Sequence, residues 1–402
     1  MSQIRATSEM LLVAALLLIT DAVSLAASTS FSSGIETGTI QNSAITEASG
    51  IAASRMSPNV LWTEEDSGNP AQVYAMTPAG TDLGTYKLSG AGNVDWEDIA
   101  VGPGPAAGTQ YIYVGDIGDN NSVRSTIAVY RVPEPVVSDV QSPVTVTLTG
   151  VSKFTFAYPD RAHDAESMFV DPLTKDIYII TKRDATYKYV YRAAYPQSTS
   201  GTTTLTLVAS LLNSNALTAA DISPDGSEII IRSYATSSGL LYQRPSGRTI
   251  ADAFATTPIA IPLHSETQGE DIGFDAAGWG YYTTSEGSHQ PIYYFDRVPH
   301  GDFNHDGTVD ASDYVVWRKG LGTTYTLDAY NTWRTNFGMP NSSKASASSV
   351  AVPEPATWVI LGLGGIALIA SNRHQCLVRN EDGSKFSTQQ NKNEPRGNAS
   401  SH

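Results

Sequence analysis

Short runs of alternating apolar and polar residues, separated by glycine, proline, asparagine and aspartate, fill the chain between residues 31 and 299. Aromatic and β-branched residues occupy the apolar positions, as in Tyr111–Val114 and Ile177–Ile180. Alternation with a period of two predicts β-strands, and the turn residues between the runs predict tight connections. Helix-promoting runs are absent from this part of the sequence. The pattern therefore predicts an all-β domain.

The strand pattern repeats along the chain. Apolar anchors recur at intervals of roughly 50 residues, which suits a repeat architecture. They are Ile51, Ile99, Met168, Ile222 and Ile272. Four short strands with their turns need about this length, and they form one blade of a β-propeller. We therefore expect a five- or six-bladed propeller over residues 28–299. A sixth blade could come from residues 125–156, or from residues 38–42 pairing with the last blade. A large β-sandwich is the alternative fold.

Composition and charge exclude several classes of partner. The chain has 402 residues, 41% of them hydrophobic, and a net charge of -15, which repels phosphate backbones, so no nucleic acid partner is expected. Cys376 is the only cysteine, so no intrachain disulfide can form. The acidity suits an exported protein exposed to calcium, although it could equally serve solubility alone.

The N-terminal residues have the order of a secretory signal peptide. A basic Arg5 precedes an apolar run from Met10 to Ile19, and small residues follow around Ala26. This order predicts a signal peptide over residues 1–27, removed by signal peptidase near Ala26.

The C-terminal region carries a second processing signal. A Ser/Ala linker over 340–351 leads to Val352-Pro-Glu-Pro, then to an apolar stretch from Ala356 to Ala370, and then to Arg373. At about 1.5 Å per residue, the stretch is a short, marginal transmembrane helix. Residues 352–374 closely resemble the PEP-CTERM sorting signal of Gram-negative bacteria. The resemblance implies transient membrane insertion, processing by an exosortase, and delivery to the cell envelope, outer surface or extracellular matrix. Residues 375–402 form a polar tail, for which we expect disorder.

A calcium-loop motif precedes the linker. Six oxygen ligands are expected at positions 1, 3, 5, 7, 9 and 12 of the loop, with Gly307 at the sharp turn. They come from Asp302, Asn304, Asp306, Thr308, Asp310 and Asp313.

A Trp-Arg helix follows this loop and is echoed by a second one, with tryptophans at Trp317 and Trp333. The duplicated unit over 300–339 resembles the type I dockerin-like repeats of planctomycete surface proteins. The second copy keeps Asp328 but lacks the full acidic series, so one calcium ion is expected. Cohesin docking and a calcium-stabilised spacer both remain open as roles.

Several phrases in the propeller region resemble an uncharacterised bacterial family that is loosely similar to TolB-like propellers. They include Asp95-Trp-Glu-Asp-Ile-Ala and Gly115-Asp-Ile-Gly-Asp-Asn. The resemblance implies the fold, with no agreed activity.

Polar residues recur where the first strand of each blade begins and the second ends. Antiparallel pairing brings these positions to one face, so we expect them around one mouth of the central channel. The expected ligand-binding residues are Glu97, Asp116, Asp119, Asn120, Glu166, Lys182, Asp221, Arg232, Glu270 and Glu286. His163 and Asp164 are expected at the same mouth as candidate catalytic residues. For Asp171 and Asp225, by contrast, the sequence favours simple turn chemistry.

Two function classes fit this pattern. The first is a surface module that binds a glycan, peptide or cation at the channel mouth, with an extracellular polysaccharide or a surface protein as its partner. The second is a calcium-dependent hydrolase of the lactonase or phosphoesterase type, acting in polysaccharide metabolism, with a metal-bound water near His163 as the nucleophile. The sequence leaves open whether the protein is an enzyme.

Overall fold

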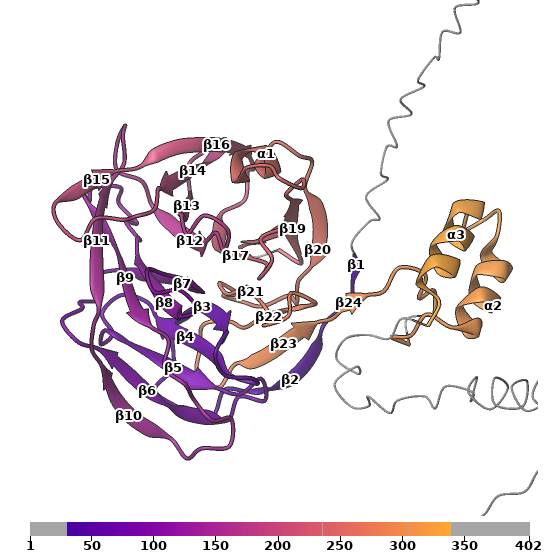
Figure 1. Ribbon diagram of the computed structural model, residues 1–402, viewed down its shortest axis with the longest axis horizontal. Coiled ribbons are helices and arrows are strands. Elements are labelled where there is room, and N and C mark those ends of the chain that lie inside the picture. The colour runs from indigo at the N-terminus through magenta and orange to yellow at the C-terminus, as the bar shows by residue number, and fades with distance from the viewer. Residues whose placement is uncertain (1–29, 235, 305, 339–402) are drawn as a thin grey trace, which may run out of the picture. The chain divides into compact units, whose positions relative to one another are not determined.

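The computed structural model describes residues 30–234, 236–304 and 306–338. Five β-sheets stand around a central axis, and Figure 1 shows them as the blades of a propeller. The innermost strands are β3, β7, β12, β17 and β21, and each contacts the next in a closed ring. The predicted all-β propeller is confirmed, with five blades.

Each blade has four antiparallel strands, and blades 1 and 2 each carry a fifth strand at the outer edge. Blade 1 contains β3 (Ala48–Ala53), β4 (Leu61–Glu65), β5 (Gln72–Met76) and β6 (Asp82–Leu88). Blade 2 contains β7 (Trp96–Pro103), β8 (Gln110–Asp116), β9 (Ile127–Pro133) and β11 (Ser152–Ala157). Blade 3 contains β12 (Ala165–Val170), β13 (Ile177–Thr181), β14 (Tyr187–Ala193) and β16 (Thr206–Leu212). Blade 4 contains β17 (Leu217–Ile222), β18 (Glu228–Ser233), β19 (Ser238–Gln243) and β20 (Ile259–Pro262). Blade 5 contains β21 (Gly273–Phe274), β22 (Tyr281–Thr283), β23 (Pro291–Phe295) and β2 (Ile35–Thr39).

The N-terminal part of the domain closes the ring. Strand β2 pairs with β23 and becomes the outer strand of blade 5, and β1 (Ser30–Phe31) pairs with β24 (Arg297–Val298). The expected pairing of residues 38–42 with the last blade is therefore correct, but it completes the fifth blade rather than a sixth. The first and last segments of the domain hold each other in place, so the closure depends on both.

The long interval between the second and third anchors is explained by an exchanged strand. Strand β10 (Val144–Leu148) leaves blade 2 and pairs in parallel with β6, at the outer edge of blade 1. Strand β15 (Thr202–Thr204) leaves blade 3 in the same way and pairs in parallel with β11. Each exchange ties neighbouring blades together, and residues 125–156 form no blade of their own.

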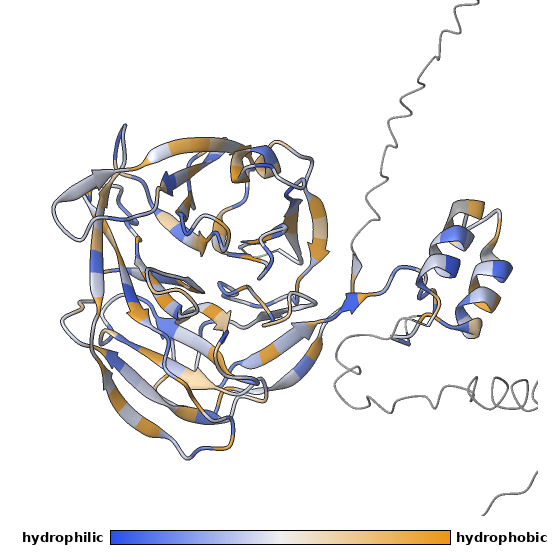
Figure 2. Cartoon of the chain, viewed as in Figure 1, coloured by the Kyte–Doolittle hydropathy of each residue, from blue (hydrophilic) through white to orange (hydrophobic). Residues whose placement is uncertain are grey.

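The hydrophobic core lies between the blades in five clusters, one at each interface. Trp62 of blade 1 and Trp96 of blade 2 are fully buried in the first of them. Strand residues alternate between the two faces of a blade, so each strand supplies both adjacent clusters, and Figure 2 shows the resulting bands of apolar and polar residues. Helix α1 (Ile250–Phe254) packs its buried Phe254 in the cluster between blades 3 and 4.

Two helices follow the propeller, α2 (Ala311–Gly320) and α3 (Leu327–Asn336). Tyr330 of α3 packs on Trp317 of α2, with ring centroids 5.0 Å apart, and Tyr314 contacts Trp333 at 5.3 Å. The two tryptophans thus belong to one aromatic cluster that joins the helices.

None of the described helices combines the length and apolar character needed to cross a membrane. The predicted signal peptide, linker, sorting signal and tail lie outside the described residues.

Candidate functional site

The inner strands begin with a β-bulge. The strand pairing shifts register by one residue at the second position of β3, β7, β12 and β17. A bulge leaves its extra residue out of the ladder and turns its side chain. The bulge residues are Ser49, Glu97, Glu166 and Thr218, and Glu270 occupies the matching place in the Glu-Asp-Ile segment of blade 5. These five residues form what we call the bulge ring, at the channel end that we call the mouth.

This register corrects the predicted position of Asp221. The letters Ala220-Asp-Ile resemble Glu97-Asp-Ile, but β17 begins at Leu217, so Thr218 is the bulge residue. Asp221 lies near the other end of the strand, where its carboxylate accepts hydrogen bonds from the amides of Phe274 and Ile222, both at 2.8 Å. Asp221 is therefore not at the mouth.

Three carboxylates converge at the mouth. One oxygen from each of Asp66, Asp95 and Glu97 lies within 4.8 Å of the others. Asp66 follows β4, and Asp95 and Glu97 flank the first residue of β7. Glu97 is buried, whereas Asp66 and Asp95 are partly exposed, so solvent reaches this mouth cluster from one side.

The backbone at Gly118 packs against the mouth cluster. A Cβ atom at Gly118 would fall 2.0 Å from Oε1 of Glu97 and 2.6 Å from Oδ2 of Asp95. The loop after β8 is also attached here, because the Gly118 amide donates to the Asp95 carbonyl at 3.1 Å. Only a glycine lets the backbone pass this close to the two carboxylates.

The electrostatics of the mouth cluster disfavour three negative charges. Burial and the Glu166 carboxylate raise the pKa of Glu97 well above its usual value. Burial and Asp66 raise the pKa of Asp95 to about 6, and burial also raises the pKa of Asp66. Like charges this close favour the protonated forms unless a cation lies between them.

Lys182 is the cation of the mouth among the described residues. Its ammonium group forms an ion pair with Glu166 and lies 3.6 Å from Glu270. Glu286 adjoins this group, because burial and a hydrogen bond with Glu270 raise its pKa to about 8. The predicted residues Glu97, Glu166, Lys182, Glu270 and Glu286 therefore gather at one mouth.

A second set of predicted residues is held by arginines beside the mouth. Arg124 forms an ion pair of 2.7 Å with Asp116, and its amide donates to Asp119 at 2.6 Å. Arg183 lies 2.8 Å from Asp164 and also donates to Asn120. These pairs fix the loops after β8 and before β12, so the four predicted residues serve the shape of the mouth.

His163 is buried and bonded through both ring nitrogens. Nδ1 lies 3.1 Å from Asp184, and Nε2 lies 2.8 Å from the Tyr191 hydroxyl and 3.1 Å from Asp160. The rings of Tyr158 and Tyr189 pack against it. Among the described contacts, none joins His163 to the mouth cluster.

Arg232 is also fully enclosed. Its guanidinium donates to the Asp271 carbonyl at 3.0 Å and to Glu266 at 2.5 Å. This pairing holds the segment before β21.

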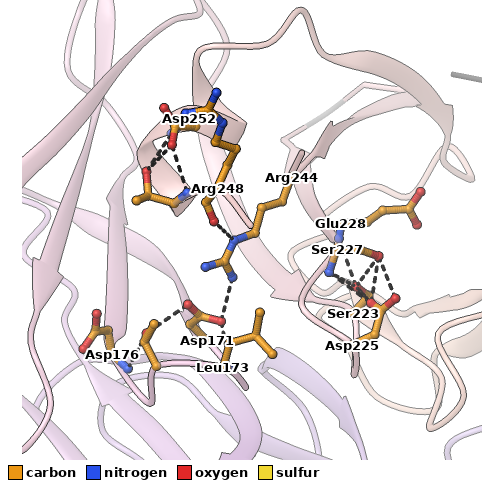
Figure 3. Close-up of polar contacts among 12 residues, drawn as sticks. Asp171, Leu173, Asp176, Ser223, Asp225, Ser227, Glu228, Arg244, Arg248 and Asp252 are labelled. Atoms are coloured by element: carbon orange, nitrogen blue, oxygen red, sulfur yellow. Dashed lines mark hydrogen bonds and ion pairs between the residues drawn. The ribbon is translucent and has the colours of Figure 1, made fainter. Parts of the chain in front are cut away.

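The two aspartates expected to act in turns do so. Asp225 accepts hydrogen bonds from the hydroxyls of Ser223 and Ser227, at 2.6 and 2.8 Å. Asp171 accepts hydrogen bonds from the Leu173 amide at 3.0 Å and from Arg244 at 3.0 Å. Figure 3 shows Arg244, which follows β19 of blade 4, reaching Asp171, which follows β12 of blade 3.

The sequence pattern does not mark Asp95, whereas it places Asp66 at the mouth with the ends of the second strands. Asp66 stands among the acidic residues that end the second strand of blade 1, and Asp95 is the first letter of Asp95-Trp-Glu-Asp-Ile-Ala. The register of the bulge, which no periodicity reveals, decides which of these carboxylates meet.

The loop before α2 brings the expected calcium ligands close together. Asp302 accepts from the Gly307 amide at 2.9 Å, and Gly307 has a positive φ of 86°, as the turn requires. Asp313 accepts from the amides of Phe303 and Asp310 at 2.7 and 2.8 Å. These bonds orient oxygen donors of the hard type that calcium prefers.

Comparison with known proteins identifies the sorting signal. Residues 351–373 match the PEP-CTERM protein-sorting motif, in agreement with the prediction for 352–374. The motif implies processing by sorting machinery of the exosortase type. The chain is thus an exported protein of the cell envelope or surface that carries a five-bladed β-propeller. No curated protein sequence matches the chain.

Solved structures of propeller type are similar to the chain at low identity. The PQQ-bound aldose sugar dehydrogenase of Streptomyces coelicolor has a TM-score of 0.39 and 11% identity, over 67% of this chain and 99% of that one. A luciferin-regenerating enzyme has a TM-score of 0.34 and 9% identity, over 63% and 92%. A chain of a mitotic checkpoint complex has 0.30 and 13%, over 58% and 60%. At these values, none of the three indicates what this chain binds or catalyses.

Proposed function

We propose that this protein is a binding module of the cell surface whose propeller holds a divalent cation at the channel mouth. Asp66, Asp95 and Glu97 are the proposed ligands, and calcium is the proposed ion. The bound cation would present open coordination positions to an oxygen-rich ligand, for which a glycan of the extracellular matrix is the proposed class.

The convergence of three carboxylates carries this proposal. Their oxygens lie within 4.8 Å of one another at a mouth that solvent reaches, and burial makes their charges costly without a cation. Calcium prefers carboxylate oxygens and tolerates irregular geometry. Gly118 lets the backbone pass close to Glu97 and Asp95, so a side chain at this position would displace both carboxylates.

The loop at 302–313 is the second proposed calcium site. Asp302, Asn304 and Asp306 would supply side-chain oxygens and Thr308 its carbonyl, with Asp313 closing the loop and Asp310 acting through water. This site would stabilise the dockerin-like helical pair, as a spacer or as a docking unit. Its ligands are separate from those of the mouth, so the two sites can be tested independently.

Calcium titration of the chelator-treated full chain tests the mouth site. The Asp306→Ala variant removes the loop site and serves as the background for the measurement. In that background, Asp95→Asn and Gly118→Ala should each lower the bound calcium by one equivalent, the first by removing a ligand and the second by displacing the carboxylates of Glu97 and Asp95. Gly92→Ala is the matched control, because a Cβ there meets only the Tyr130 hydroxyl, at 4.0 Å.

Unchanged calcium stoichiometry in both variants would refute the mouth site. A panel of lactones and phosphoesters assayed with the same calcium-loaded proteins tests the hydrolase alternative. Turnover that is lost with Asp95→Asn and His163→Ala would favour that alternative over a binding module.

A further inference from the structure

A second ring of residues lies one position deeper than the bulge ring. It consists of Gly50, Asp98, Ser167, Ala219 and Asp271, each directly after its bulge residue or, in blade 5, after Glu270. All of these residues are buried. Two of them are carboxylates, and they differ in how they are held.

The carboxylate of Asp98 has hydrogen-bond partners in two other blades. Its carboxylate accepts hydrogen bonds from the amide of Met168 at 2.6 Å and from that of Ala220 at 3.2 Å. These amides belong to the inner strands of blades 3 and 4, so the side chain of blade 2 reaches two other blades. The channel is therefore narrow here, and side chains from different blades meet.

Glu64 enters this ring from the neighbouring strand. It pairs with Gly50 across β3 and β4, and cross-strand partners share a face of the sheet. A Cβ atom at Gly50 would lie 3.0 Å from Oδ1 of Asp98, so no side chain fits at position 50. Glu64 thus lies beside Asp98, on the face that glycine leaves open.

Neither oxygen of Glu64 has a hydrogen-bond partner among the described residues, although the side chain is completely buried. Besides burial, the strongest influences that raise the pKa of Glu64 are the carboxylates of Asp271 and Asp98. A carboxylate in this position is costly, because burial removes its water and nothing replaces it.

The carboxylate of Asp271 resembles that of Glu64 in its surroundings. It is completely buried, and neither of its carboxylate oxygens has a partner in the described part of the chain. Arg232 lies nearby, but it donates to the Asp271 carbonyl and to Glu266 instead. In the ring itself, the Ser167 hydroxyl is buried without a partner as well.

We propose that Glu64 and Asp271 hold a second divalent cation inside the channel, below the mouth cluster and separate from it. Carboxylates and a hydroxyl are hard oxygen donors, so calcium is the ion that this ring suits. The ion would bind the two carboxylates directly, which Arg232 does not do because it donates to the Asp271 carbonyl and to Glu266. It would also join blade 1 to blade 5, where the ring of blades closes. The proposal is independent of the mouth site, because it uses other ligands.

Metal analysis of the full chain tests the proposal. Proteins are dialysed against calcium, freed of unbound ion, and measured by mass spectrometry of the metal. Glu64→Gln and Asp271→Asn should each lower the calcium content by one equivalent, and together by the same single equivalent. Asp95→Asn should remove a different equivalent, so that Glu64→Gln with Asp95→Asn loses two. Glu65→Gln is the matched control on the same strand: Glu65 is buried and accepts hydrogen bonds from Glu47 and Tyr74, and its loss should leave the calcium content unchanged.

Thermal unfolding provides a second measurement. With calcium, Glu64→Gln should unfold at a lower temperature than the parent. With chelator the order should reverse, because the substitution removes an unpartnered buried charge. Two outcomes would overturn the proposal: an unchanged calcium content in both Glu64→Gln and Asp271→Asn, which would mean that protons neutralise the pair, or the loss of one shared equivalent in Glu64→Gln and Asp95→Asn, which would mean a single site at the mouth.

Discussion

Glu64 and Glu65 are adjacent on β4, yet their carboxylates have opposite surroundings. Glu65 accepts hydrogen bonds from the Glu47 amide at 3.1 Å and the Tyr74 hydroxyl at 3.2 Å. Glu64 has no partner among the described residues. Successive strand residues point to opposite faces, so one carboxylate ties the N-terminal loop of blade 1 and the other turns toward Asp98. Burial alone therefore does not distinguish Glu64 from Glu65, whereas the missing hydrogen-bond partners do.

The mouth carboxylates predict how the stability of the metal-free protein changes with pH. Burial raises the pKa of Asp95 to about 6, and burial with the Glu270 hydrogen bond raises the pKa of Glu286 to about 8. Both exceed the values of an unfolded chain, roughly 4, so the folded state binds more protons between these limits. The contribution of these two carboxyl groups to the stability of the folded state is complete below about pH 4 and is lost as the pH rises through 6 to 8. In chelator, the unfolding temperature should therefore fall between pH 5.5 and pH 8.5.

Glu286→Gln is the control for this prediction. It removes the group with the higher pKa, so the fall above pH 7 should become smaller. An unfolding temperature that is constant or rises over this interval in chelator would contradict the assignment.

The sequence predicted the residue types of the mouth better than the contacts among them. The recurrence of glutamate at one register pointed to Glu97, Glu166 and Glu270, and these do gather with Lys182. Asp95 was missed because it lies before the strand, and Asp221 was misplaced because its letters copy the repeat two residues out of register. Which carboxylates meet depends on the bulge, and a bulge leaves no signal in a pattern of apolar positions.

At the scale of elements, the bulge and the glycine after it shape the channel in blade 1. Gly50 follows the bulge residue Ser49, and a Cβ atom there would lie 2.7 Å from the Ile99 amide of the next inner strand. Side chains are absent at this point because two strands approach closely.

Gly50→Ala should therefore destabilise the propeller. The added methyl group meets backbone atoms that cannot rotate away, so β3 and β7 must separate, at a cost of about 1–3 kcal/mol. The free energy of unfolding in denaturant measures this. Gly92→Ala, where the added methyl group has room, is the control and should change stability little. Equal stability of Gly50→Ala and the parent would show that the strands are not packed as closely as described.

The repeat predicted the inner and second strands of the blades, because both are buried and rich in β-branched and aromatic residues. The number of blades stayed open between five and six, since β10 and β15 belong to one blade by sequence and to another by pairing. Strand exchange of this kind is determined by tertiary contacts between blades and not by the local sequence. Residues such as the exposed Val144 and Val146 carry no local signal for it.

At the scale of the whole molecule, export and fold agree. The net charge of -15, the PEP-CTERM motif at 351–373 and a domain without cysteine suit a protein that works outside the cell and is stabilised by packing. The blade interfaces supply that packing, and strand β2 closes the ring. The proposed calcium sites would add stability where carboxylates gather.

The sorting motif predicts where a truncated protein is found. Deletion of residues 352–402 should release the propeller into the medium, because the signal for retention is gone while export continues. Cell fractionation with an antibody to the propeller measures this, and the Asp306→Ala full-length protein is the control that should stay with the cells. A truncated protein that remains attached to cells would transfer the anchoring role to the helical pair.

Anomalous diffraction tests most directly whether Asp66, Asp95 and Glu97 bind a divalent cation. Crystals of the full chain grown with calcium and soaked in terbium, which replaces calcium and scatters anomalously, should show a peak in contact with all three carboxylates. The same peak should be missing in Asp95→Asn crystals treated identically. A difference map with terbium in the loop at 302–313 but none at the mouth would contradict the claim.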